Sequence, residues 1–205
     1  MIAIIDYGVG NLFSVEKAFA ALGAEAKITN DPDEIKAAEK LVLPGVGAFG
    51  DCMKNLEGSG LIPLLKEEVA AGKLLLGICV GLQILFSGSE ESPDAKGLGF
   101  IPGQVKRIQA EGLKVPHMGW NRLHLTEPRQ EKDLFAGLEQ DKEYVYFVHS
   151  FHAVPEDKNV ITATTNYGEV ITAAVRKDNI FATQFHPEKS GDVGLHIIKN
   201  FCDLK

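Results

Sequence analysis

Cys79 is the residue of this sequence best placed to act as a nucleophile. It stands in the stretch K-L-L-L-G-I-C-V-G-L-Q-I-L-F at 73–86, where an apolar run typical of a buried strand gives way to apolar residues at helical spacing. A nucleophile at a sharp strand-to-helix turn needs small neighbours, and Gly77 and Gly81 stand two positions before and after it. The N-terminus of the following helix would favour the thiolate. The alternative is an inert core thiol, the commoner fate of cysteine in an apolar setting.

A candidate base and an orienting acid lie in the segment Q-F-H-P-E-K-S at 184–190. A strand-like run at 179–183 precedes it, and Pro187 cannot continue a strand ladder. The chain should therefore leave the sheet where His186 and Glu188 are presented. With Cys79 they would complete a nucleophile, a base and an acid that orients the base.

Strand-like and helix-like segments alternate through the first half, which predicts a parallel sheet with helices on both faces. Asn11 is expected to cap the first helix, and Asp31 with Pro32 to begin the second. The expected strands lie at 2–5, 24–28, 41–43 and 74–78, and a further helix at 62–71.

The second half changes to short strands joined by turns. The segment K-D-N at 177–179 should join the last two as a hairpin, a helix at 193–201 closes the chain, and 88–96 reads as a polar surface loop. The expected strands lie at 105–108, 113–115, 121–125, 144–148, 160–164, 170–175 and 180–183.

Composition predicts one globular domain over residues 1–205, which would bury roughly 70% of the surface of the unfolded chain. Hydrophobic residues make up 45% and charged residues 24%, without an apolar run long enough to span a bilayer. The start M-I-A-I-I-D-Y-G lacks a basic leader, so we expect a cytoplasmic protein. The three scattered cysteines fit reduced thiols, and the net charge of −7 argues against a nucleic-acid partner.

Two other patterns could be mistaken for ligand sites. Gly8 and Gly10 do not begin a dinucleotide fingerprint, because Phe13 occupies the third glycine position. His149 and His152 lack a convincing third ligand, so we expect no metal.

The turn P-G-V-G at 44–47 is either an ordinary tight turn or, beside a nucleophile, a source of backbone N–H groups for an oxyanion.

The segments G-I-C-V-G-L-Q and F-H-P-E together resemble the class I, triad-type glutamine amidotransferases. Further blocks resemble one branch of that family, the glutaminase subunits of imidazole glycerol phosphate synthase. These blocks are D-Y-G-V-G-N-L at 6–12, P-G-V-G-A-F at 44–49, G-L-G-F-I-P-G at 97–103, P-H-M-G-W-N at 116–121 and Y-F-V-H-S at 146–150. One departure is Phe151, where that branch more often has Tyr, so one hydrogen bond of the family is in doubt.

The resemblance implies an α/β fold, a flavodoxin-like and mainly parallel sheet flanked by helices with an added antiparallel strand layer, and a site at the carboxyl ends of the strands. It implies that Cys79 attacks the side-chain amide of glutamine, with His186 as base and Glu188 orienting it. The residues to which it assigns other roles are Val46, Gly47 and Val80 for the oxyanion, Gly47, Gln83 and Ser150 for glutamine binding, and Asn11, Trp120 and Lys189 for docking and coupling.

The resemblance also implies a heterodimer with a (β/α)₈-barrel synthase subunit, which would use the ammonia to make imidazole glycerol phosphate and a purine precursor, without a metal or organic cofactor. Two alternatives stay open. One is an amidotransferase serving anthranilate, pyridoxal phosphate or nucleotide synthesis. The segments P-G-V-G, P-H-M-G-W-N and H-P-E-K-S-G argue against it. The other is a redox-sensing or chaperone-like protein of the same fold that uses only the thiol of Cys79, which would leave His186 and Glu188 unemployed.

Overall fold

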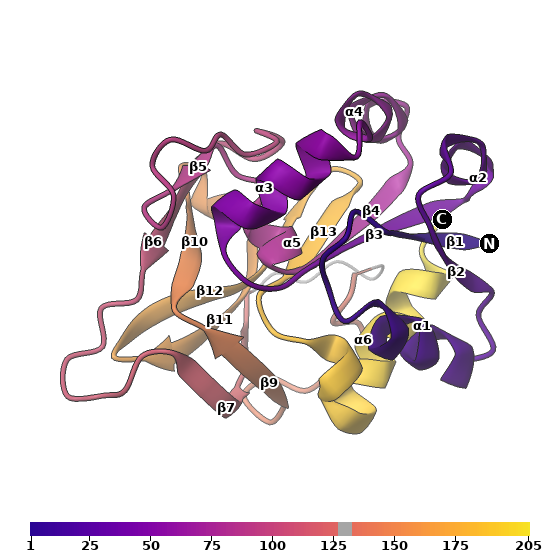
Figure 1. Cartoon of the computed structure of the whole chain (residues 1–205). Coiled ribbons are helices and arrows are strands. Elements are labelled where there is room, and N and C mark those ends of the chain that lie inside the picture. Colours follow the sequence, from indigo (N-terminus) through magenta and orange to yellow (C-terminus); the bar gives the residue numbers. More distant parts are fainter. Residues whose placement is uncertain (127–132) are drawn as a thin grey trace.

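A central sheet of eight strands runs through the molecule in the computed structural model, which describes residues 1–126 and 133–205 (Figure 1). In spatial order the strands are β2 (Ala26–Thr29), β1 (Ile2–Ile5), β3 (Lys40–Gly45), β4 (Leu74–Cys79), β13 (Ile180–Thr183), β12 (Glu169–Lys177), β11 (Ile161–Tyr167) and β8 (His124–Leu125). The first five are parallel, and the last three continue the sheet antiparallel. This arrangement confirms the predicted mainly parallel sheet with antiparallel additions.

Two smaller sheets stand beside the antiparallel end of the central one. The first contains β10 (Phe151–Pro155), β6 (Gly103–Arg107) and β5 (Gly88–Ser89), and the second contains β7 (His117–Arg122) and β9 (Tyr144–His149). The helices are α1 (Leu12–Ala21), α2 (Pro32–Ala37), α3 (Phe49–Gly58), α4 (Ile62–Ala70), α5 (Val80–Gln83) and α6 (Gly191–Asp203), with single 3-10 turns η1 (Lys158–Val160) and η2 (Pro187–Lys189).

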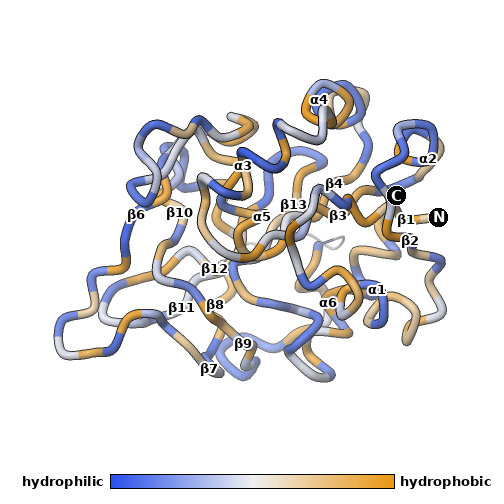
Figure 2. The backbone as a smooth tube through the Cα atoms, viewed as in Figure 1, coloured by the Kyte–Doolittle hydropathy of each residue, from blue (hydrophilic) through white to orange (hydrophobic). Residues whose placement is uncertain are grey.

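Helices cover both faces of the parallel strands. Figure 1 shows α1 and α6 on one face and α3 and α4 on the other. Every residue of β1, β3 and β13 is consequently buried, which is why these strands read as continuous apolar runs. Helices α1, α3, α4 and α6 each bury one side, and hydrophobic and hydrophilic stretches alternate along α4 in Figure 2. In the described part of the chain, no helix is long and apolar enough to cross a membrane.

Several expectations about single elements were wrong. Residues 113–115 are not a strand, because the Lys114 carbonyl accepts from the Tyr167 hydroxyl and Leu113 N–H closes a turn on Ala110. The strand expected at 121–125 is split, since β7 pairs with β9 whereas β8 joins β11 in the central sheet. The polar loop expected at 88–96 begins with the buried strand β5. Neither α3 nor β10 was predicted.

The helix after Cys79 is also shorter than its apolar spacing indicates. It ends at Gln83, because the carbonyls of the next three residues accept hydrogen bonds from the returning segment at 98–101 and not from a further helical turn. Asn11 does precede α1, as predicted, but its side chain makes no capping hydrogen bond. Asp31 caps α2 through Asp33 N–H, as expected.

The closest backbone approach near the centre of the sheet lies where β3, β4 and α5 meet. A Cβ atom on Gly81 would lie 1.9 Å from the Leu43 carbonyl oxygen, and one on Gly45 would lie 2.6 Å from Gly81 N. Gly58, also in a helix, has open space around it and an ordinary backbone conformation. Of these three positions, Gly45 and Gly81 require glycine for steric reasons, whereas Gly58 does not.

We predict that Gly81→Ala destabilises the protein by about 3 kcal/mol or more, because the new methyl group must displace backbone atoms. Gly58→Ala is the matched control and should be neutral or stabilising by up to roughly 1 kcal/mol, because alanine favours helix. Urea unfolding of the two variants measures both effects. Equal stability of the two variants would contradict the steric argument.

Candidate active site

Cys79 occupies a strained turn between β4 and α5. Its φ of 57° and ψ of −112° place a residue other than glycine at positive φ, a conformation that persists only where the surrounding structure enforces it. Gly77 and Gly81 provide the room, since a Cβ on Gly77 would come within 2.9 Å of Gly81 O. The expected elbow is therefore present in the structure, although the helix behind it has a single turn.

His186 and Glu188 lie next to each other where the chain leaves β13. His186 Nδ1 is 2.7 Å from Glu188 Oε1, and both side chains are almost completely buried. The backbone fixes the histidine, because His186 N–H donates to Tyr146 O and its carbonyl accepts from the Ser190 hydroxyl. Pro187 begins the η2 turn, which brings the carboxylate back onto the imidazole.

The carboxylate determines which nitrogen of His186 faces the thiol. An ionised carboxylate only accepts, so Nδ1 carries the proton and Nε2 is left for Cys79. Burial lowers the pKa of His186, but hydrogen bonds with Cys79 and Glu188 outweigh it and raise that pKa to about 9. The imidazole is thus well suited to hold a proton beside the sulfur at neutral pH.

One cavity of about 310 Å³ brings most of the predicted site residues together. Glu188 lies behind its wall, against His186. The predicted residues that line the cavity are Val46, Gly47, Cys79, Val80, Gln83, Ser150, His186 and Lys189. Its wall also contains residues that were not predicted as site residues: Glu91, Pro116, Val148, His149 and Phe151.

The turn expected to supply oxyanion donors lies at the cavity wall. Val46 and Gly47 follow β3, and Gly47 has a φ of 89° that favours glycine. Val80 is the first residue of α5, where an N–H group has no acceptor within the helix. The three residues on which the oxyanion expectation depends therefore line the same cavity as Cys79.

Gln184 is a site residue that the sequence reasoning missed. Its amide nitrogen lies 3.8 Å from Cys79 Sγ as a donor, and its oxygen accepts from Gln83 Nε2 at 3.1 Å. Gln83 Nε2 also donates to Phe151 O at 3.1 Å. Both amide hydrogens of Gln83 are therefore engaged within the protein, which leaves its carbonyl oxygen to contact a ligand. The available signal was the position of Gln184 two residues before His186.

The two histidines that could suggest a metal are engaged differently. His149 Nδ1 donates to Phe151 O and its Nε2 accepts from His117 Nδ1 at 3.0 Å. Burial lowers the pKa of His149 to about 3 and that of His117 to about 4. His152 Nε2 instead lies 3.7 Å from Glu169 Oε1, so the side chains of His149 and His152 point to different surroundings.

The residues expected to couple the site to a partner surround the η2 turn. Lys189 belongs to that turn and lines the cavity, and the exposed Trp120 lies beside Gly191, just after it. Helix α1, which Asn11 precedes, also packs against η2. Asn11 and Trp120 do not themselves line the cavity, so any influence they have on it is indirect.

The chain belongs to the class I glutamine amidotransferases. Residues 3–204 match the family described as "Glutamine amidotransferase class-I". Solved structures of this class share the fold: a glutamine amidotransferase superposes with a TM-score of 0.75 at 22% identity and covers 98% of each chain. The structure entitled PurLQS from Thermotoga maritima gives a TM-score of 0.76 at 19% identity, covering 98% of this chain and 97% of its own.

Relatives of higher identity carry a more particular name, imidazole glycerol phosphate synthase subunit HisH. The protein of Syntrophotalea carbinolica is 52% identical over 210 residues, covering the whole of both chains. That of Methanothermobacter thermautotrophicus is 54% identical over 204 residues, covering 100% of this chain and 98% of its own. That of Bacillus subtilis is 46% identical over 209 residues, covering 100% and 96%.

We predict that kcat/KM for glutamine hydrolysis falls above about pH 9, where His186 loses the proton needed by the leaving group. Because the Glu188 carboxylate is one of the groups that raise this pKa, Glu188→Gln should move the alkaline limb to lower pH and reduce kcat strongly, leaving residual activity. The measurement is kcat/KM against pH. Glu91→Gln, which removes a carboxylate of the cavity wall but not the partner of His186, should leave the limb in place. An unshifted limb in Glu188→Gln would contradict the assignment.

Proposed function

We propose that residues 1–205 form a single glutaminase domain, the glutamine-hydrolysing subunit of an imidazole glycerol phosphate synthase in histidine biosynthesis. Family membership and the names of relatives about 50% identical over their full length support this. The observation that carries the chemistry is the buried His186–Glu188 pair at 2.7 Å with its free imidazole nitrogen toward Cys79. Similarity to other amidotransferases, such as the PurLQS structure, is one of fold alone at 19% identity.

The reaction proceeds in two halves. The Cys79 thiol gives its proton to His186 Nε2 as Sγ attacks the side-chain carbonyl carbon of glutamine, and the resulting oxyanion accepts hydrogen bonds from Val80 N–H and from the Val46–Gly47 turn. His186 Nε2 passes that proton to the amide nitrogen, the C–N bond breaks, and ammonia leaves a thioester. His186 then takes a proton from the water that attacks the thioester and returns it to Sγ as the C–S bond breaks, which releases glutamate and restores the thiol.

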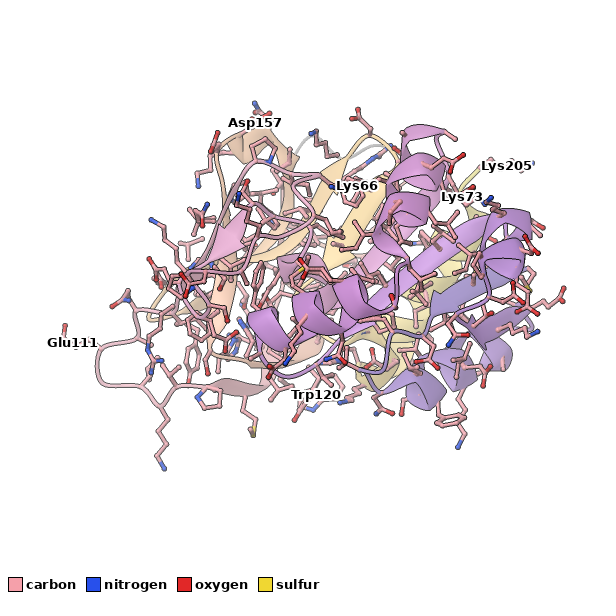
Figure 3. The ribbon with its side chains drawn as sticks, turned by 45° about the horizontal axis from the view of Figure 1, so that its top comes forward. Lys66, Lys73, Glu111, Trp120, Asp157 and Lys205 are labelled. Atoms are coloured by element: carbon pink, nitrogen blue, oxygen red, sulfur yellow. The ribbon has the colours of Figure 1, made fainter. Side chains whose placement is uncertain are left out.

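The partner is proposed to be the barrel synthase subunit of a heterodimer, which receives the ammonia. The names of the relatives, which call each a synthase subunit, support a complex. The surface offers apolar side chains for it, because Phe13, Met118 and Trp120 are more than half exposed. Trp120 is labelled in Figure 3. A cytoplasmic location, expected from the sequence, is part of the same proposal.

We predict that Cys79→Ala abolishes glutamine-dependent synthesis by the complex but leaves ammonia-dependent synthesis intact, because the barrel needs ammonia and not the thiol. The measurement is imidazole glycerol phosphate formation with each nitrogen source. Cys202→Ala, which changes a thiol far along the chain in α6, is the matched control and should behave as wild type. Glutamate release by Cys79→Ala above background would remove Cys79 as the nucleophile.

A second prediction separates docking from coupling. Trp120→Ala should weaken association with the barrel subunit, since an exposed aromatic side chain of this size is a typical binding anchor. We also expect glutaminase activity to rise steeply when the barrel subunit carries its nucleotide ligand. Lys189→Ala should weaken this stimulation more than it weakens association, because Lys189 lines the cavity one residue after Glu188. Titration calorimetry measures association, and glutamate release with and without the ligand measures stimulation. An unchanged stimulation ratio in Lys189→Ala would place the coupling elsewhere.

A further inference from the structure

Two buried side chains contact the turn beside Cys79 from behind. The Tyr7 hydroxyl donates a hydrogen bond of 2.5 Å to Pro44 O, and the Cys52 thiol donates one of 3.3 Å to Val46 O. Tyr7 follows β1 and Cys52 lies in α3, so two elements far apart in the sequence bind alternate carbonyls of one short turn. The mechanism above uses neither side chain.

The bond from Cys52 fixes the orientation of one peptide group. In a trans peptide the C=O of Val46 and the N–H of Gly47 point in opposite directions. Because the Val46 carbonyl points to α3, Gly47 N–H points away from that helix. Gly47 lines the cavity together with Cys79, whereas Cys52 does not. The thiol therefore holds Gly47 N–H on the side of the turn where substrate would bind.

We propose that Tyr7 and Cys52 are positioning residues that clamp the 44–47 turn, so that Gly47 N–H is ready to donate to the oxyanion formed on the glutamine carbonyl. This inference rests on the proposed glutaminase function. It assigns a role to Cys52 and to the hydroxyl of Tyr7, and it makes Gly47 the donor that pairs with Val80.

The turn needs such a clamp because its own backbone is permissive. Gly47 has a positive φ, and no heavy atom lies within 4 Å of the position that a Cβ would take, so that neither a side chain nor tight packing there restricts its backbone. Gly45, by contrast, is wedged between Gly81 N and the Tyr7 hydroxyl, which a Cβ would approach to 2.6 and 3.0 Å. The turn is thus anchored at Gly45 and free at Gly47, and the hydrogen bond to Val46 O lies between the two.

Both donors keep their protons under ordinary conditions. Burial raises the pKa of the Tyr7 hydroxyl well above its usual value, and the neighbouring Cys52 raises it further. Burial also raises the pKa of the Cys52 thiol to about 11. Neither group therefore competes with Cys79 as a nucleophile at neutral pH, and both remain hydrogen-bond donors to the turn.

The test compares Cys52→Ala and Tyr7→Phe, which delete one donor each, with Cys52→Ser, which keeps a donor at nearly the same place. In the complete complex, the first two should lower the kcat of glutamate release roughly tenfold with little change in KM. That is less than the hundred- to thousandfold loss for removing an oxyanion donor, because Gly47 N–H is loosened and not deleted. Cys52→Ser should recover most of the loss, and Cys202→Ala should match wild type.

A second measurement distinguishes the clamp from general damage to the site. Iodoacetamide alkylates a thiolate at a saturated carbon without forming an oxyanion, so the alkylation rate of Cys79 should be the same in Cys52→Ala, Tyr7→Phe and wild type. Mass spectrometry assigns the alkylated cysteine. Slower alkylation in step with slower turnover would show that the variants disturb the nucleophile, and the proposal would be wrong.

The remaining outcomes separate this proposal from the function on which it rests. If wild type releases no glutamate in the complex, the glutaminase function fails. If wild type is active and both deletion variants retain wild-type kcat, the function stands and the clamp is overturned. In the double variant Tyr7→Phe with Cys52→Ala, the loss should be smaller than the product of the two single losses, because both act on one turn. Fully multiplicative losses would mean that the residues act separately.

Discussion

The close backbone approach of β3, β4 and α5 is the constraint on which the site depends. Gly45 and Gly81 meet with no room for a side chain, and the Leu43 carbonyl occupies the position that a Cβ on Gly81 would take. This contact holds Cys79, the last residue of β4, in its strained conformation and places Gly45, at the end of β3, beside it. Cys79, the proposed nucleophile, and the Gly45 end of the 44–47 turn are thus parts of one rigid junction, which is the kind of preorganisation that stabilises a transition state.

The His186–Glu188 pair is buried, although burial disfavours charged groups. Burying an ion pair removes hydration that is regained only with good geometry and satisfied partners. His186 and Glu188 have a short hydrogen bond, but Glu188 Oε2 has no partner among the described residues. Stability alone would favour a second donor there. An unshared carboxylate instead keeps its full charge for the imidazolium, so the arrangement gives up some folding free energy for a stronger base.

Local sequence was sufficient to predict the turn at Cys79 and the pairing of His186 with Glu188. The spacing G-I-C-V-G implies an elbow, and H-P-E implies a histidine and a carboxylate held together by a turn; the structure has both. The alternation of apolar runs was sufficient for the parallel strands. The features that local sequence could not predict depend on contacts between residues far apart in the chain. Helix α5 is short because segment 98–101 hydrogen-bonds the carbonyls that a longer helix would use. Residues 113–115 do not form a strand, because the Lys114 carbonyl accepts a hydrogen bond from the Tyr167 hydroxyl. Gln184 comes within reach of Cys79 only because β13 lies beside β4.

A short series of contacts connects the exposed surface at Trp120 and α1 with His186 and Glu188. Trp120 on β7 lies beside Gly191, the first residue of α6, two positions after η2, and α1 packs against η2 itself. The same turn carries Glu188 and Lys189, and β9 holds His186 through Tyr146 O. A protein bound across α1 and β7 would therefore press on the segment that orients the base, without needing charge to act over a long distance. The 44–47 turn is held from the core side by Tyr7 and Cys52. Because Tyr7 lies on the segment between β1 and α1, docking on α1 would reach this turn through Tyr7 as well as His186 through η2.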